Sequence, residues 1–150
     1  EICACLVGSE MCIRDRTYTV DNSAFEITIP AVIRPSDRAT SFKVGAELVN
    51  IRPDEYIEVS ISSGCDSRSM VVMKRQNVPA GKTVSTLETR FSAGGNPIGS
   101  NGYIVGHFED GSNIVNSIGD ISMSAVNAND KTEAGDYLAT IEFKVDLKKK

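Results

Sequence analysis

The fold is decided by the stretch Gly135-Asp136-Tyr137-Leu138-Ala139-Thr140-Ile141-Glu142-Phe143-Lys144-Val145-Asp146-Leu147. From Tyr137 onward every odd-numbered position is apolar, and every even-numbered position from Thr140 onward is polar or charged. Because successive side chains of a strand point to opposite faces, this period of two predicts a strand with one face on a core and the other in water. An α-helix cannot produce that pattern.

Shorter upstream segments repeat this alternation and extend the prediction to a sheet protein. The expected core faces are Phe25, Ile27, Ile29, then Phe42, Val44, Ala46, Leu48, then Ile57, Val59, Ile61. Further strands are expected at 17–20, 70–73, 103–108 and 120–126, with an irregular one at 82–91. Asp21-Asn22-Ser23 is expected to turn the chain, and Asp110-Gly111 is a hairpin signal. Eight or nine short strands separated by turns predict a β-sandwich or Greek-key barrel.

Composition excludes two function classes. The 150 residues suit one domain, and no apolar run approaches the roughly 18 residues that a membrane helix needs. The formal net charge of −4 argues against nucleic-acid binding, which normally requires a basic patch. We therefore expect no membrane span and no nucleic-acid partner, a single domain over residues 17–147, and a solvated basic tail at 148–150.

The first sixteen residues differ from the rest and hold three of the four cysteines. Met11-Cys12-Ile13-Arg14-Asp15-Arg16 resembles the translation of a DNA-sequencing transposon adapter. We interpret residues 1–16 as a non-native, adapter-derived segment, and expect the natural N-terminus and an export signal to be missing. Cys65 is then the one remaining cysteine.

Candidates for chemistry are few. One loop holds three candidate Ca²⁺ ligands, Asp130, Glu133 and Asp136, since hard cations favour several carboxylates. The Asp-x-Asp-x-Asp-Gly frame of a calcium-binding loop is missing. We therefore prefer to interpret this stretch as a solvated acidic loop. Cys65 with His107 could form a thiol hydrolase pair, and His107 with Glu109 could offer two metal ligands from one strand face. The glycine-rich loop 92–102 lacks the Lys-Ser/Thr ending of a phosphate-binding loop. We predict no catalytic centre, no metal and no cofactor.

Three motifs in order carry a family resemblance: Ile29-Pro30-Ala31-Val32, Asn50-Ile51-Arg52-Pro53 followed by Ile57-Glu58-Val59, and Ala134-Gly135-Asp136-Tyr137 through Val145. Together they resemble small secreted proteins of gut Firmicutes with an immunoglobulin-like sandwich. The resemblance covers most of residues 25–147 and matches poorly at 62–78. It implies an immunoglobulin-like antiparallel fold, an extracellular or cell-surface location, and no known catalytic residues.

Two functions from different classes follow as expectations. The first is a non-catalytic structural or interaction module at a bacterial surface, adhesin-like or pilin-like, that binds itself or another surface protein by strand addition. The alternative is a carbohydrate- or ligand-binding domain that uses loops 92–102 and 127–135 at one end of the sandwich.

Overall fold

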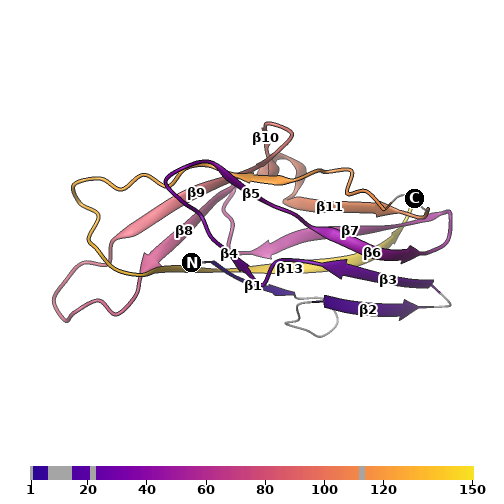
Figure 1. Cartoon of the computed structure of the whole chain (residues 1–150), viewed down its shortest axis with the longest axis horizontal. Coiled ribbons are helices and arrows are strands. Elements are labelled where there is room, and N and C mark those ends of the chain that lie inside the picture. The colour runs from indigo at the N-terminus through magenta and orange to yellow at the C-terminus, as the bar shows by residue number, and fades with distance from the viewer. Residues whose placement is uncertain (1, 7–14, 21–22, 112–113) are drawn as a thin grey trace.

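The structure, a computed structural model, describes residues 2–6, 15–20, 23–111 and 114–150. These residues form an all-β sandwich, as the alternating segments predict (Figure 1). The strands within the described ranges are β1 (Ile2–Leu6), β2 (Asp15–Val20), β3 (Ser23–Thr28), β4 (Val32–Ile33), β5 (Thr40–Phe42), β6 (Gly45–Asn50), β7 (Glu55–Ser63), β8 (Met70–Arg75), β9 (Thr86–Ala93), β10 (Asn96–Pro97), β11 (Ile104–Glu109), β12 (Ile121–Met123) and β13 (Tyr137–Lys149). A 3-10 helix, η1 (Ile98–Asn101), follows β10. Each expected strand is present; the expected strand at 42–48 is divided between β5 and β6, and the short strands β1, β4 and β10 are additional. The expected turn at Asp21 and Asn22 lies outside the described residues.

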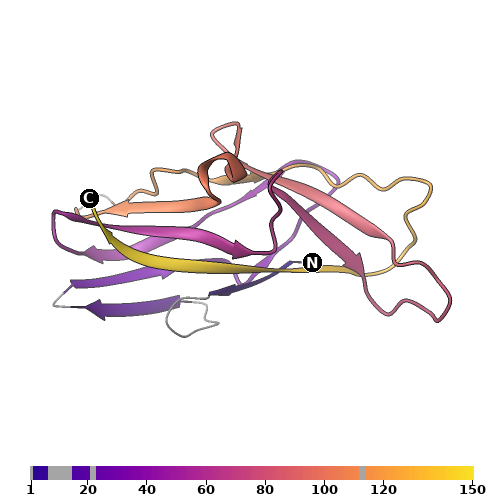
Figure 2. The ribbon, with the colours of Figure 1, turned by 180° about the vertical axis from the view of Figure 1, so that it is seen from behind.

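Two sheets make the sandwich. The smaller has the order β2-β3-β6, and the larger runs β11-β7-β13-β8-β9-β12-β5, with β1, β4 and β10 attached beside this path. All pairings are antiparallel within the described residues except that of β1 with β13. The molecule is elongated, with the β8–β9 connection at one end and the C-terminus at the other (Figures 1 and 2).

One hydrophobic core joins the two sheets. Ile57, Val59, Ile141 and Phe143 are fully buried, and Ile27 is 5% exposed, so the faces predicted for these three strands are confirmed. Burying such side chains stabilises the fold by about 1.5–3 kcal/mol each. Because residues from both ends of the chain share this core, it holds the sandwich together as one unit.

The face predicted for residues 42–48 is wrong in its second half. Phe42 and Val44 are buried, but Leu48 is 45% exposed and Val49 is buried instead. A register shift causes this change: Ile27 pairs with Ala46, whereas the preceding Glu26 pairs with Leu48. The extra residue in β6 is a bulge, which reverses the faces of all residues beyond it.

The hairpin predicted at Asp110-Gly111 is also wrong. β11 pairs with β7, and β12 pairs with β9 and β5 rather than with β11. Asn116 holds the intervening segment: its Oδ1 accepts the His107 N–H at 3.0 Å, and its Nδ2 donates to Val105 O at 2.9 Å and Val44 O at 3.2 Å. These bonds, with that from Ser117 N to His107 O at 3.1 Å, hold the segment against β11 without a second strand.

The terminal lysines, expected as a solvated tail, extend β13 instead. Lys148 and Lys149 pair with Tyr56 and Glu55 of β7. The Lys148 ammonium contacts the Glu58 carboxylate, and Lys150 Nζ lies 3.1 Å from Glu109 Oε2. Carboxylates on the neighbouring strands thus compensate the lysine charges, which composition alone does not reveal.

Candidate functional site

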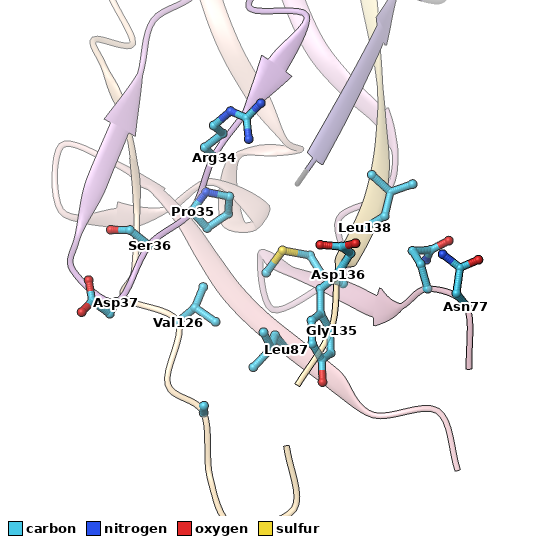
Figure 3. A pocket seen from close by; sticks show the side chains of 14 residues that line it. Arg34, Pro35, Ser36, Asp37, Asn77, Leu87, Val126, Gly135, Asp136 and Leu138 are labelled. Carbon is cyan, nitrogen blue, oxygen red and sulfur yellow. The ribbon is translucent and has the colours of Figure 1, made fainter. Parts of the chain in front are cut away.

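An open groove of about 700 Å³ lies beside the start of β13 (Figure 3). Residues of β8, β9 and β13 and of the segments that follow β4, β8 and β12 or precede β13 line it: Arg34, Pro35, Ser36, Asp37, Met73, Gln76, Asn77, Leu87, Val126, Ala128, Gly135, Asp136, Tyr137 and Leu138. We call it the β13 groove. No single stretch of sequence points to it, because its walls come from five separate segments.

Backbone hydrogen bonds fix the two walls of the β13 groove. Val126 N donates to Ser36 O at 2.8 Å, which joins the segment after β4 to the segment after β12. On the other wall, Gln76 N donates to Asp136 O at 2.7 Å and ties the end of β8 to the start of β13. Figure 3 shows Arg34, Pro35 and Val126 on one side, Asp136 and Leu138 on the other, and Leu87 between them.

The chemistry of the β13 groove is mixed. Met73, Leu87 and Val126 supply apolar surface between the walls. The charged lining residues are Arg34, Asp37 and Asp136, two carboxylates against one guanidinium. Such a lining suits a ligand with an apolar part and a basic group.

The β13 groove lies next to the strand β1. β1 lies between β13 and β4: Ile2 to Leu6 pair in parallel with Ala139 to Phe143, and Ile2 and Cys3 pair antiparallel with Ile33 and Val32. Leu138 precedes the paired residues of β13, and Arg34 follows those of β4. Both residues line the groove, which therefore lies beside the strands that flank β1.

The three candidate Ca²⁺ ligands do not converge. Glu133 bonds the Arg75 guanidinium, while Asp136 lines the β13 groove, and Asp130 is exposed on the loop. No three His, Cys, Asp or Glu side chains in the described part of the chain group to hold a metal. The Arg75 guanidinium already offsets the negative charge of the Glu133 carboxylate, so this carboxylate needs no bound cation.

The structure does not bring Cys65 and His107 together. His107 lies opposite Glu58 in β7, whereas Cys65 follows the end of that strand at Ser63. At roughly 3.3 Å per residue, Glu58 and Ser63 alone are about 16 Å apart. Burial raises the pKa of the Cys65 thiol to about 11, and the Asp66 carboxylate adds to the rise. Cys65 is thus a thiol with little thiolate at neutral pH.

His107 and Glu109 do share a face, but other groups occupy them. His107 Nε2 lies 3.4 Å from Glu109 Oε1, and its ring stacks on Tyr56 with 4.8 Å between centroids. The hydrogen bond from Lys150 to Glu109, with that from His107, lowers the pKa of the Glu109 carboxyl. The Glu109 carboxylate is therefore already paired, with the Lys150 ammonium at Oε2 and with the His107 ring at Oε1.

The two loops expected to form one binding end are separated. Loop 92–102 carries β10 and η1 midway along the molecule, whereas 127–135 lies at the far end beside the β8–β9 connection (Figures 1 and 2). A shallow pocket of about 430 Å³ joins 127–135 to residues 83–86 instead. Its lining is rich in hydroxyl and charged groups: Thr83, Ser85, Thr86, Asn129, Lys131, Thr132 and Glu133.

Comparison with known proteins gives no match to a family model, to a curated protein or to a solved structure. The resemblance to secreted immunoglobulin-like proteins of Firmicutes accordingly stays a prediction. In the described residues, no helix has the length and apolar character needed to cross a membrane.

Proposed function

We propose that this protein is an extracellular or cell-surface interaction module that joins other chains, copies of itself included, by strand addition at β13. The observation that supports the proposal is β1 itself, which pairs with β13 over five positions and with β4 on its other edge. An edge that accepts a strand within the chain presents backbone donors and acceptors that a strand from another chain can use.

The origin of β1 adds support. Its residues belong to the segment interpreted above as adapter-derived, so a strand unrelated to the domain pairs with the β13 edge. Main-chain hydrogen bonds depend little on side-chain identity, which makes such an edge receptive to extended segments in general. The surface location follows from the family resemblance.

A reversible disulfide between β1 and β13 tests this proposal. Cys3 pairs with Thr140 in the backbone register, so Thr140→Cys places two cysteines at paired positions of neighbouring strands, and oxidation is expected to join them by a disulfide. Cys5→Ser, Cys12→Ser and Cys65→Ser remove the other thiols. Light scattering should show mass rising with concentration for the reduced chain and a constant monomer mass for the oxidised chain.

The matched control is Lys144→Cys in the same background, since Lys144 lies beyond the last residue paired with β1. It should form no disulfide with Cys3 and should associate equally in both redox states. Disulfide-linked dimers of the Thr140→Cys chain would support strand exchange directly. A monomer mass at every concentration in the reduced state would overturn the proposal.

A second candidate function, carbohydrate binding, is favoured by the hydroxyl-rich pocket at residues 83–86 and 129–133. Hydroxyl, amide and charged groups can exchange hydrogen bonds with a sugar. A glycan array with and without Ca²⁺ tests this function, with Thr86→Val and Thr132→Val as the pocket variants. Binding that both variants abolish would support it, and an array blank in both conditions would exclude it.

A further inference from the structure

We infer that the open edge of β9, at residues 86–88, accepts an extended segment of a partner protein with a basic residue opposite Glu88 and an acidic residue near Lys131. This surface goes beyond the proposed function, because β8 separates β9 from β13 in the sheet. The inference starts from the hydrogen-bond register of β9 with its two neighbours, β8 and β12.

The ladder between β8 and β9 shows which backbone groups of β9 face away from β8. Phe91 N donates to Ser69 O at 2.9 Å, in register with this ladder. Because hydrogen-bonded and non-hydrogen-bonded pairs alternate along an antiparallel ladder, the odd-numbered residues of β9 bond to β8. The N–H and C=O groups of Thr86 and Glu88 therefore point to the opposite side.

Only one end of that opposite side is covered, by β12. β12 pairs with the last residues of β9, and Ser124 N then donates to Arg90 O at 2.9 Å. The same register would place Val126 opposite Glu88, but Val126 N donates to Ser36 O instead, at 2.8 Å. The connection to β13 then curves away from β9 (Figures 1 and 2). Among the described strands, none pairs with this side of β9 from Glu88 back to its start.

A groove runs along this open edge. Two hollows of about 430 and 380 Å³ lie beside it, and both are lined by Thr86 and Asn129. The larger also reaches Val84 and the smaller reaches Glu88, so we call the two together the β9 groove. At roughly 3.3 Å per residue, Val84 and Glu88 are about 13 Å apart. An extended chain can bond to an open edge of this kind through its own backbone.

Two charges in the β9 groove remain open to a partner. Glu88 lines one hollow and Lys131 lines the other, and neither forms an ion pair with another described residue. Arg68, whose guanidinium Glu88 attracts through space, is bonded to a carboxylate of its own turn. The third charged residue of the groove, Glu133, contacts Arg75. A basic group therefore fits at Glu88 and an acidic group at Lys131.

Continuity with β12 sets the direction of the partner. β12 runs antiparallel to β9, and a partner in the place that Val126 leaves would continue this ladder in the same direction. It would meet Glu88 before Thr83, which lines the same hollow as Lys131. Val84 is 48% exposed, so a valine opposite it gains apolar contact. The expected segment thus has a lysine or arginine, then β-branched residues, then an acidic residue about five positions after the first.

A fluorescein-labelled peptide, Ser-Lys-Val-Thr-Thr-Val-Glu, is the probe, and the charge-swapped peptide Ser-Glu-Val-Thr-Thr-Val-Lys is its matched control. Fluorescence anisotropy should show the probe bound about tenfold more tightly than the control. The double variant Glu88→Lys with Lys131→Glu should reverse this order, because it exchanges the two charges of the groove. Equal affinities for the two peptides, or an order that the double variant leaves unchanged, would overturn the inference.

Methylated peptides test the backbone ladder. In the expected register the first threonine of the probe lies opposite Thr86 and donates its N–H to β9, whereas the N–H of the second threonine points away. Methylating the first nitrogen should weaken binding about tenfold, and methylating the second should leave binding unchanged. Equal affinity of the two methylated peptides would show contact by side chains alone and overturn strand addition at β9.

The two redox states of the Thr140→Cys chain separate this inference from the proposed function. The probe should bind equally in both states, since β9 and β13 are not neighbours. Binding that oxidation abolishes would place the peptide at the β13 edge and overturn the role of β9. Dimers of the oxidised chain that the probe dissociates would assign the β9 edge to a second copy and overturn the peptide partner. A reduced chain that stays monomeric while the probe still binds would overturn the proposed function alone.

Discussion

At the residue scale, a few positions are set by close backbone contact that no periodicity shows. Gly64 has a φ of +96°, and a Cβ built on it would lie 2.3 Å from Thr140 O. This glycine lets the chain leave β7 directly against β13. Ser69 is similarly specific: it is buried, and its hydroxyl oxygen accepts the Gly99 N–H at 2.6 Å, which anchors η1.

Gly64→Ala should destabilise the protein by about 2–4 kcal/mol, because backbone strain and overlap with β13 act together. Gly81→Ala is the control, since Gly81 has a φ of +79° and a Cβ added to it would have no atom within 4 Å. It should cost only about 1 kcal/mol. Urea unfolding monitored by circular dichroism measures both, and equal losses would contradict the close-contact argument.

Asp66 organises the turn before β8. The Met70 N–H donates to its Oδ1 at 2.9 Å and holds the pKa of the Asp66 carboxyl below its ordinary 3.8, with Arg68 adding to the effect. A depressed carboxyl pKa contributes stability that is present above 3.8 and is lost as pH falls through the folded-state value.

Asp66→Asn should therefore flatten the acid dependence of stability below pH 3.8 while the dependence near neutral pH stays as in the parent. The measurement is the urea midpoint in steps from pH 7 downward. Asp130→Asn, in an exposed loop, serves as the charge control. An acid profile of Asp66→Asn that overlays the parent would show that this carboxyl contributes nothing to the turn.

At the element scale, the alternation of apolar residues predicts strands well but not their phase after a bulge. β7 and β13 keep one phase across their buried residues, so Ile57, Val59, Ile141 and Phe143 could be predicted as core. β6 changes phase after Ala46, and the cause lies in its pairing with β3. The sequence of one strand does not show which strand it pairs with or in which register. The burial of Val49 therefore could not be predicted from the residues around it.

The phase of β6 is tested by a pair of neighbouring substitutions. Leu48→Lys should change stability by less than about 0.5 kcal/mol, because Leu48 is already 45% exposed. Val49→Lys buries an unpaired charge and should cost about 3 kcal/mol or more. Thermal unfolding of the two variants decides the matter, and the reverse ranking would place Leu48 in the core.

β9 shows a second limit of pattern reading. Thr89 is fully buried, at a position where the pattern expects an apolar residue, and its hydroxyl donates to Ser124 O at 2.8 Å. The hydrogen bond removes the penalty for burying that hydroxyl. A core position occupied by a polar residue cannot be recognised from the sequence when its hydrogen-bond partner is distant along the chain.

At the scale of the whole molecule, β13 is the strand that connects the parts. It pairs with β7, β8 and β1, and its first residues form a wall of the β13 groove. In the described residues, β4 joins the larger sheet through its pairing with β1, and the segment that follows β4 forms another wall of the groove.

Weakening β1 should loosen this region selectively. Ala4→Pro removes a backbone donor at the position paired with Ile141. Amides of residues 139–143 that point toward β1 should then exchange with deuterium faster, while those facing β7 stay protected. Hydrogen exchange with Ala4→Val as the control measures this, and unchanged protection in Ala4→Pro would mean that β1 does not shield the β13 edge.

The amino-acid sequence by itself determined the fold class and the main core faces, because the period of two acts over a few neighbouring positions. Only the tertiary structure decided the bulge in β6, the path after β11, the separation of Cys65 from His107, and the assembly of the β13 groove from five segments. Each of these depends on which distant strands lie side by side. That choice is made by packing one common core, and no local stretch contains it.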